Sequence, residues 1–467
     1  MPLQKNQVLT LQVERLSSDG SGVAHSPEGE TVFIPGAAPG DEARVRIVKD
    51  CKRYAFGILD EVLKPSPDRI PVDCAVAGPC GGCSLRHLDY AAELRAKQEN
   101  VADAFARIGG LDVPVLPIVG SPEIDRYRNK VQFPVGTDKA GRPCIGFYAG
   151  RTHRIVPCPD CRLQPGVLNE IGNALCAFFA EKGIQPYSEE TGRGLVRHIF
   201  LRRGAHSGQI MVCLVCTRAK LPSAEELCTR LKAQFAEITT ILMNVNAKNT
   251  NVILGTETHT LYGQGYIEDT LCGVPVQLGP LSFYQVNTLA AEQLYGIAAQ
   301  YAQLTPDDLL LDLYCGMGTI GLSMAAHCRE LIGVEIVPEA IESAKANAAR
   351  MGADVAAKSR FFCADAGQAA TRLAAEGLHP DIVMLDPPRK GCDEATLSAV
   401  VRMSPRRVVY VSCNPATAAR DAAWLEQNGY HAEKVQPVDL FPRTKHCEAV
   451  LLLTKLNVER HIEVDVS

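Results

Sequence analysis

The chain has 467 residues, too many for one ordinary domain, so its length predicts two to four domains. Hydrophobic residues make up 46% and charged residues 22%, as in ordinary globular proteins, and the net charge of -5 excludes a uniformly basic nucleic-acid-binding protein. No apolar run approaches the roughly 18 residues that a membrane helix needs, and residues 1–10 do not resemble a signal peptide, so we expect a cytoplasmic protein.

The first 62 residues have the pattern of a small β-barrel. Short strands are expected at 7–16, 31–34 and 42–47, and turns that contain glycine separate them. Strands this short and evenly spaced are typical of small barrels. The three prolines in 65–71 then predict a linker to the rest of the chain.

Three closely spaced cysteines, Cys74, Cys80 and Cys83, follow this linker, with glycines between them. Thiolates at such spacing hold either zinc or an iron–sulfur cluster, and the spacing does not distinguish the two. A site of either kind needs a fourth ligand from elsewhere in the chain. Most of the 18 cysteines are expected to be small buried hydrophobic residues rather than disulfide partners.

The middle of the chain is predicted to be an α/β or α+β domain. It is preceded by a helix from about 90 to 108, which two glycines at 109 and 110 should end. The shared apolar face of this helix comprises Leu94, Val101, Phe105 and Ile108. The other expected elements are strands at 210–216 and 241–245 and helices at 165–182 and 223–235.

Positive charge is concentrated in the same region. Residues 125–162 contain eight Lys or Arg and three Asp, a net charge of +5, and residues 191–220 contain six Lys or Arg and no acidic residue. The rest of the chain is therefore acidic. A basic middle on an acidic body is typical of a protein that binds nucleic-acid phosphates with one face only.

From about residue 275 the pattern changes to regular alternation of strands and helices. Buried strands are expected at 309–314, 330–334, 382–385 and 408–411, with a helix at 338–351 after the second of them. Strands that alternate with helices of this length predict a parallel, doubly wound sheet.

A glycine-rich turn follows the first of these strands and opens a helix. Gly316, Gly318 and Gly321 let the backbone turn sharply and approach a ligand closely, and Glu335, at the end of the next strand, can accept hydrogen bonds from ribose hydroxyls. This geometry serves NAD and S-adenosylmethionine alike. The rigid turn Asp386-Pro-Pro-Arg389 favours S-adenosylmethionine, because many enzymes that use it to modify bases carry Asp-Pro-Pro or Asn-Pro-Pro at this point.

Two residues near the same sheet edge are candidates for catalysis. Cys413, in Ser-Cys-Asn-Pro, directly follows a predicted strand, where a thiolate is placed to react, although a buried structural thiol is the commoner fate of cysteine. Glu448, two residues after His446, precedes the expected final strand at 449–453 and can act as a general base.

Together these motifs resemble the RNA 5-methyluridine methyltransferase family, over almost the whole chain. The segments Asp19-Gly-Ser-Gly22 and Val32-Phe-Ile-Pro-Gly36 resemble a TRAM domain, an RNA-binding barrel. The resemblance implies a TRAM barrel at 1–62, a central domain at 63–274 and a Rossmann-like methyltransferase domain at 275–467. It also implies that RNA is the partner, with no obligate protein partner.

The resemblance further implies roles for individual residues. Cys413 would add to carbon 6 of uracil, carbon 5 would then accept the methyl group of S-adenosylmethionine, and Glu448 would remove the proton from carbon 5. The implied cofactor-binding residues are Gln285, Tyr314, Thr319, Glu335, Asp365 and Asp386. The implied ligands of a [4Fe-4S] cluster are Cys74, Cys80, Cys83 and Cys161, with Cys158 as a rival for the fourth place.

Members of this family act on 23S ribosomal RNA or on transfer RNA, and a TRAM domain combined with a cysteine cluster resembles the ribosomal branch. Two other interpretations remain open at this point. A nicotinamide dehydrogenase would bind NAD and would give Cys413 and Glu448 no joint role. A non-catalytic RNA-binding protein on a methyltransferase scaffold would form no covalent adduct with RNA.

Overall fold

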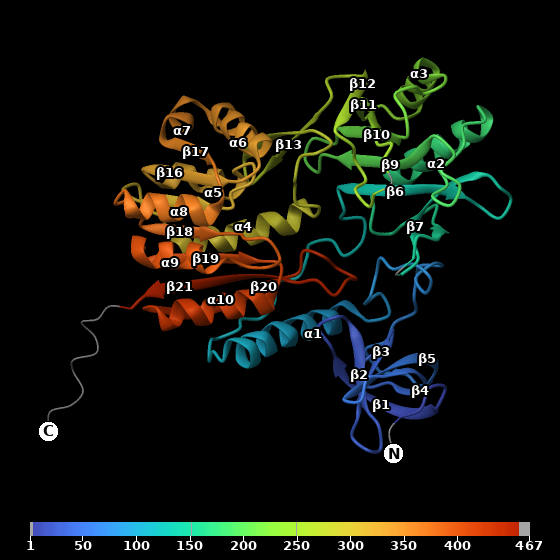
Figure 1. The fold of residues 1–467 in the computed structure, drawn as a ribbon, viewed down its shortest axis with the longest axis horizontal. Coiled ribbons are helices and arrows are strands. Elements are labelled where there is room, and N and C mark those ends of the chain that lie inside the picture. The colour runs from blue at the N-terminus through green and yellow to red at the C-terminus, as the bar shows by residue number, and fades with distance from the viewer. Residues whose placement is uncertain (1–2, 151, 249, 457–467) are drawn as a thin grey trace.

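The computed structural model describes residues 3–150, 152–248 and 250–456. It consists of an N-terminal barrel, a central sheet with two helices, and a larger C-terminal α/β domain, and a long helix, α1, runs between the barrel and the C-terminal domain (Figure 1). Within the described residues, no helix is both long enough and apolar enough to cross a membrane.

The N-terminal barrel is closed, with the strand order β1-β2-β3-β5-β4. Inward-facing residues alternate with exposed ones, and Val13, Ile34 and Val45 lie in its interior. Closure leaves no exposed sheet edge in this small domain. Its strands are β1 (Val8–Leu16), β2 (Ser21–His25), β3 (Thr31–Pro35), β4 (Glu42–Asp50) and β5 (Tyr54–Lys64).

The central sheet has seven strands in the order β12-β11-β10-β9-β6-β7-β8. Helices α2 (Gly166–Glu181) and α3 (Ala224–Gln234) pack on one face, while Phe200 and Met211 on the other face belong to the core of the C-terminal domain. The strands are β6 (Lys130–Thr137), β7 (Pro143–Tyr148), β8 (Ile155–Pro157), β9 (Val196–Arg203), β10 (Ile210–Cys216), β11 (Ile238–Val245) and β12 (Glu257–Tyr262). The hairpin of β13 (Ile267–Leu271) and β14 (Val274–Leu278) leads into the C-terminal domain.

The C-terminal domain confirms the predicted doubly wound sheet. Its strand order is β17-β16-β15-β18-β19-β21-β20, in which β15 to β19 are parallel and β21 runs antiparallel between β19 and β20. The strands are β15 (Leu309–Leu313), β16 (Glu330–Glu335), β17 (Ser359–Cys363), β18 (Ile382–Leu385), β19 (Arg407–Ser412), β20 (Tyr430–Val438) and β21 (Glu448–Lys455).

Helices cover both faces of this sheet. Side chains of α4, α5 and α6 share one core with it, and those of α8, α9 and α10 share the other. The helices are α4 (Thr288–Ala302), α5 (Thr319–Met324), α6 (Pro338–Met351), α7 (Ala353–Lys358), α8 (Ala366–Ala375), α9 (Glu394–Met403) and α10 (Pro415–Gln427). The fold therefore brings the ends of five parallel strands to one edge, where ligands of doubly wound sheets bind.

The helix predicted near residue 90 is present, but its buried face differs from the expectation. It is an α-helix, α1 (Tyr90–Asp103), followed by a π-helical turn at Ala104–Gly109, and Gly110 ends it with a φ of 65°. Val101 and Phe105 are buried as predicted, whereas Ile108 is 58% exposed. The expectation was wrong for Ile108 because the wider π turn departs from the 3.6-residue period used to place it.

Instead, α1 buries charged side chains against the C-terminal domain. The Lys97 ammonium lies 2.7 Å from the Glu93 carboxylate and 2.8 Å from that of Asp439, and all three are fully buried. Burial raises the pKa of Glu93 to about 7, although the Lys97 charge opposes this. The segment after α1 also bridges to β20, at Val115 and Val119. Residues 90–119, expected within the central domain, thus pack on the C-terminal domain.

Candidate active site

Cys413 lies at the carboxyl end of β19, in a turn that side chains hold in place. The Ser412 hydroxyl accepts a hydrogen bond from the backbone N–H of Asn414 at 3.0 Å. The Asn414 amide donates to the carbonyl of Arg389 at 2.9 Å, and its oxygen caps α10. The turn that carries Cys413 is therefore tied to the Asp-Pro-Pro-Arg turn after the neighbouring strand β18.

Glu448 faces the same point from the antiparallel strand β21. The register pairs Ser412 with Ala449, which sets Cys413 opposite Glu448 at the strand ends. Glu448 is only 6% exposed. Burial raises its pKa to about 8, the charge of Asp386 adds to this, and Arg389 opposes it. A buried carboxyl group with a pKa near neutrality suits proton transfer.

Asp386 completes this group of side chains from the end of β18. Burial raises its pKa to about 7. Asp386 and Glu448 both act on Cys413: burial raises the pKa of the thiol, and the two carboxylates raise it further. The structure thus brings together three residues that the sequence predicted separately, from β18, β19 and β21.

Arg389 is a member of this group that the sequence motif contained without assigning it a role. Its positive charge and its hydrogen bond to the Cys413 thiol both lower the pKa of that thiol, against the effects of burial and of the two carboxylates. Its guanidinium also lies 3.0 Å from Nδ1 of His446. An exposed arginine after a proline turn has no distinctive sequence signal, so only the structure identifies it as the cation beside the thiol.

The glycine-rich turn between β15 and α5 forms the adjoining part of the edge. Glu335 accepts hydrogen bonds from the backbone N–H groups of Gly316, at 3.2 Å, and Val337, at 2.9 Å. Gly316 and Gly318 have φ values of 55° and 79°, which favour glycine. Tyr314 also has a positive φ, of 65°, an uncommon conformation for a bulky residue and one often found at functional sites.

The remaining predicted cofactor residues lie along the same edge. The Tyr295 hydroxyl is 3.2 Å from that of Thr319 and also hydrogen-bonds Gln285. The carbonyl of Gln285 accepts a hydrogen bond from the Asn129 amide at 2.7 Å, which joins this loop to the central domain. Asp365 follows β17 and caps α8 through the N–H of Gln368.

The properties of this edge fit S-adenosylmethionine. The carboxyl group of Asp312 is buried, and one of its oxygens has no hydrogen-bond partner within the described chain. Burial raises its pKa to about 8, and the charges of Asp386 and Glu335 raise it further. Clustered acidic groups favour a cationic ligand, such as a sulfonium. Next to Glu335, the apolar side chain of Ile336 is 61% exposed.

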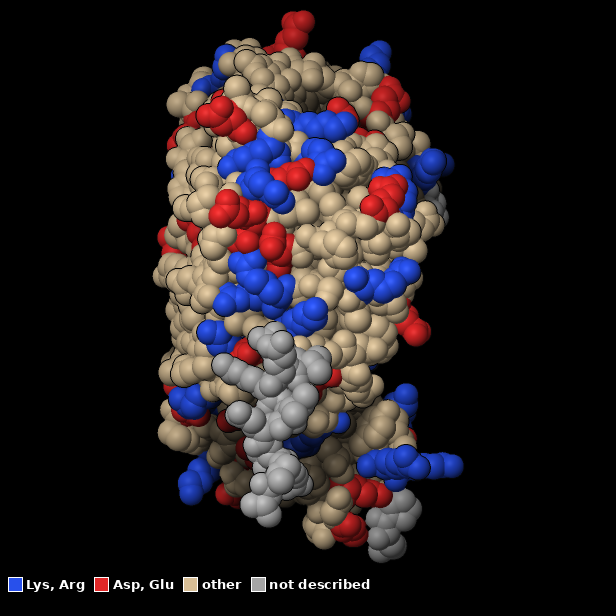
Figure 2. Space-filling model, turned by 90° about the vertical axis from the view of Figure 1, so that its left-hand side faces the viewer, with Lys and Arg blue, Asp and Glu red and all other residues tan. Residues whose placement is uncertain are grey.

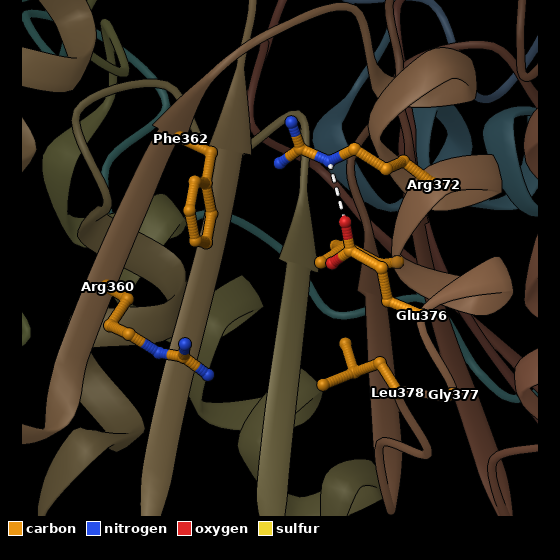
Figure 3. Close-up of a pocket in the computed structure, with 7 residues that line it drawn as sticks. Arg360, Phe362, Arg372, Glu376, Gly377 and Leu378 are labelled. Carbon is orange, nitrogen blue, oxygen red and sulfur yellow. Dashed lines mark ion pairs between the residues drawn. The ribbon is translucent and has the colours of Figure 1, made fainter.

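Two surface pockets flank α8, and Cys413 lines neither of them; Figure 3 shows the one beside β17. One, of about 370 Å³, lies beside β17, and Arg360, Phe362 and Arg372 line it. Arg372 forms a 3.6 Å ion pair with Glu376, four residues along the chain, on one side of this pocket. The other, of about 440 Å³, includes Asp365, the only predicted cofactor residue that lines either pocket.

The cysteines of the predicted cluster gather in one place. The thiols of Cys74, Cys80 and Cys161 are close enough for their charges to interact, and Cys83 interacts with the latter two. Cys158 hydrogen-bonds Cys161, which lowers the pKa of Cys161 and raises its own. Among the described residues, no group of three or more His, Cys, Asp or Glu side chains is arranged to hold a metal ion, so the iron–sulfur ligands stay a prediction.

Ion pairs neutralise part of the predicted basic surface. Arg126 lies 2.6 Å from Asp160, and Arg142 lies 2.9 Å from Asp138. The guanidinium of Arg197 donates to backbone carbonyls instead. The aspartates partly neutralise Arg126 and Arg142, and the carbonyls occupy hydrogen-bond donors of Arg197, so these residues are less available to RNA than their number in the sequence suggests.

The end of the C-terminal domain farthest from the central domain carries mixed charge. Figure 2 views this end and shows Lys and Arg side chains interspersed with Asp and Glu side chains. A surface of alternating sign does not favour a polyanion. This end is therefore a poor candidate for an RNA-binding surface.

Comparisons with known proteins show what the chain is similar to. The family model of tRNA (uracil-5-)-methyltransferases matches residues 89–456, and that of the TRAM domain matches residues 2–59. An uncharacterized RNA methyltransferase of Halalkalibacterium halodurans is 43% identical over 98% of this chain and 99% of its own. Another, of Oceanobacillus iheyensis, is 41% identical over 97% of this chain and 98% of its own. The crystal structure of Pyrococcus abyssi tRNA (uracil-54, C5)-methyltransferase with S-adenosyl-L-homocysteine has a TM-score of 0.76 at 26% identity, over 96% of this chain and all of that one.

Proposed function

The chain belongs to the family of tRNA (uracil-5-)-methyltransferases and is an RNA methyltransferase that uses S-adenosylmethionine, and from this premise we propose that it methylates carbon 5 of a uridine in 23S ribosomal RNA, in the cytoplasm. The observation that carries the proposed chemistry is the position of Cys413 opposite Glu448, with Asp386 and Arg389 beside them. The substrate rests on the combination of a TRAM barrel with a cysteine cluster, which resembles the ribosomal branch of the family.

In the proposed first step, Cys413 activates the base. Carbon 5 of uracil is a poor nucleophile, and addition of the Cys413 thiolate to carbon 6 makes carbon 5 enolate-like. Because burial and two carboxylates raise the pKa of this thiol, the positive charge of Arg389 has to stabilise the thiolate. The target base must leave its stack to reach the thiol, which costs least in an RNA loop.

S-adenosylmethionine, when bound, supplies an electrophilic methyl group on a cationic sulfur. Gln285, Tyr314, Thr319, Glu335, Asp365 and Asp386 would hold it along the edge described above. Once carbon 5 carries the methyl group, Glu448 accepts the proton of that carbon. Elimination across carbons 5 and 6 then restores the double bond of the ring and releases the Cys413 thiolate.

Methyl transfer from labelled S-adenosylmethionine tests this function directly. The purified protein is mixed with unmodified 23S ribosomal RNA and, separately, with unmodified transfer RNA. We expect label to appear as 5-methyluridine in the ribosomal RNA. Label in transfer RNA alone would overturn the ribosomal assignment and keep the chemistry, whereas label in neither RNA would count against both.

Transfer RNA is the second candidate substrate because one observation favours it. The Pyrococcus abyssi enzyme, which matches this chain over its whole length, is by name a transfer-RNA methyltransferase acting at uracil 54. The same experiment decides between the two, because both RNAs are offered under identical conditions.

We also propose that Cys74, Cys80, Cys83 and Cys161 hold a [4Fe-4S] cluster. The chemistry of the donors fits: the thiols lie within reach of one another's charge, and none of them forms a disulfide. The lowered pKa of Cys161 favours the thiolate, which is the form that binds metal. The cluster would be structural, since methyl transfer contains no redox step.

Protein purified without oxygen should contain about four irons and four sulfides per chain. Replacing Cys161 by serine should remove most of this iron, whereas Cys158→Ser should leave it, because only the first supplies a ligand. Iron and acid-labile sulfide analyses of both variants measure the outcome. Retention of iron in Cys161→Ser with loss in Cys158→Ser would transfer the fourth ligand to Cys158.

A further inference from the structure

Two basic side chains at the start of β6 have no acidic partner. Within the described chain, Lys130 forms no hydrogen bond or ion pair through its ammonium group, and no carboxylate pairs with Arg128. Nε of Arg128 is buried and lacks a hydrogen-bond partner, while the guanidinium hydrogen-bonds the neighbouring Tyr127. These two residues differ in this respect from Arg126 and Arg142 of the same region, which are neutralised by aspartates.

A third cation, Arg202, lies beside Lys130 because of the fold. The antiparallel register of β6 and β9 sets Lys130 directly opposite Arg202, so that both side chains leave the same face of the sheet. Arg202 is 1% exposed, and its guanidinium donates to the carbonyls of Gly279 and Ser282. Burial and the charges of Arg202 and Arg128 lower the pKa of Lys130 to about 8.

Like charges placed opposite each other destabilise a sheet pair. Such an arrangement persists where an anionic ligand compensates it, because a bound anion turns the repulsion into attraction. Lys130, whose charged head forms no bond of its own, is the member free to bind such a ligand. Arg202, fixed by two carbonyls, supplies charge without moving.

The position of these cations connects them to the site of chemistry. Tyr127, the residue before Arg128, donates a hydrogen bond to the carbonyl of Pro442 at 3.0 Å. The charge of Arg128 reaches His446, which lies 3.0 Å from the guanidinium of Arg389. Arg128 therefore lies within electrostatic reach of His446, which in turn contacts the cation beside the Cys413 thiol.

We propose that Lys130 and Arg128 form a phosphate-binding site that holds the RNA backbone next to the flipped uridine. The proposal rests on the proposed function, and it names the part of the substrate that these residues contact. The chemistry is that of phosphate recognition by partly desolvated cations that no carboxylate neutralises within the described chain. The Arg202 guanidinium acts as a fixed charge behind this site.

The test is the salt dependence of RNA binding by the full-length protein. Lys130→Gln and Arg128→Gln are compared with the wild type, by anisotropy of labelled transcripts of 23S ribosomal RNA and of transfer RNA at several salt concentrations. Each variant should lower the slope of log affinity against log salt by about one and weaken binding at 0.1 M salt by about fivefold to eightfold. Lys232→Gln is the matched control, since Lys232 lies on α3, across the sheet from Lys130, and should change neither quantity.

Two further measurements separate this role from others. The affinity for S-adenosylhomocysteine should stay unchanged in both variants, and the melting temperature of Lys130→Gln should be equal to or above that of the wild type, because repulsion from Arg202 is relieved. An unchanged salt slope, a loss of S-adenosylhomocysteine affinity or a lowered melting temperature would each overturn the proposal. Because wild-type methyl transfer is measured independently, a failure here is distinguishable from a failure of the proposed reaction.

Discussion

Replacing Cys413 by alanine should reduce methyl transfer to RNA by at least about 10⁴-fold, because the thiol that lies opposite Glu448 is the proposed nucleophile for carbon 6 of uracil. The affinity for S-adenosylhomocysteine should remain that of the wild type, since the glycine-rich turn and Glu335 are separate from the thiol. Single-turnover assays with labelled S-adenosylmethionine and calorimetry with S-adenosylhomocysteine measure the two effects.

A second measurement on the same variant shows whether the lost step is covalent. RNA containing 5-fluorouridine should form a stable adduct with the wild type, because fluorine at carbon 5 cannot leave as a proton does, and none with Cys413→Ala. Cys51→Ala, in the turn between β4 and β5, is the matched control and should form the adduct normally. Adduct formation by Cys413→Ala would assign the nucleophile to another residue and contradict the mechanism.

Replacing Glu448 by glutamine should slow product release about 10²- to 10⁴-fold, the usual contribution of a general base, while leaving the attack of Cys413 possible. The variant should therefore accumulate a covalent complex with ordinary, unfluorinated RNA. Denaturing gel electrophoresis after a single turnover detects this complex. Glu433→Gln, an exposed position on the neighbouring strand β20, should release its product as the wild type does.

The rate of proton removal by the wild-type protein should depend on pH, and the pKa of Glu448 gives the direction of this dependence. The pKa of Glu448 is raised to about 8, so below that pH the carboxyl group holds its proton and cannot accept another. The rate of proton removal should accordingly rise with pH up to about 8, and a bound cationic sulfonium would move this rise to lower pH. In Glu448→Gln the rise should disappear. A profile unchanged by the substitution would assign proton removal to another group.

Much of the C-terminal fold was predictable because its signals are local. Each buried strand precedes a turn of distinctive composition, and the parallel order of the strands brings these turns to one edge. Cys413 and Asp386 could therefore be placed near each other from sequence alone. Their alignment with Glu448 required the antiparallel insertion of β21 between β19 and β20, which no local pattern encodes.

Other features could not be predicted because their causes are distant in the sequence. Glu93 and Lys97 look like an exposed i,i+4 pair, yet they are buried because Asp439 completes their network from 342 residues beyond Lys97. The proposed role of Lys130 in binding phosphate likewise depends on a distant residue, because the strand register places Lys130 opposite Arg202 in another strand. Counting charges along the chain gives the same weight to Lys130 as to Arg126, whose charge Asp160 neutralises.

The docking of α1 on the last strands has a consequence for how the molecule is made. During synthesis, α1 leaves the ribosome long before Asp439 exists, so Glu93 and Lys97 remain without this partner until the 342 residues that follow Lys97 have been translated. The link between Arg443 and Glu93 spans 350 residues and is equally late. Contacts between residues this far apart in sequence form slowly, and they are among the last contacts to form. Catalytic competence should therefore arise in one late step, when β20 and β21 enter the sheet, bring Glu448 opposite Cys413 and fix α1 at the same time.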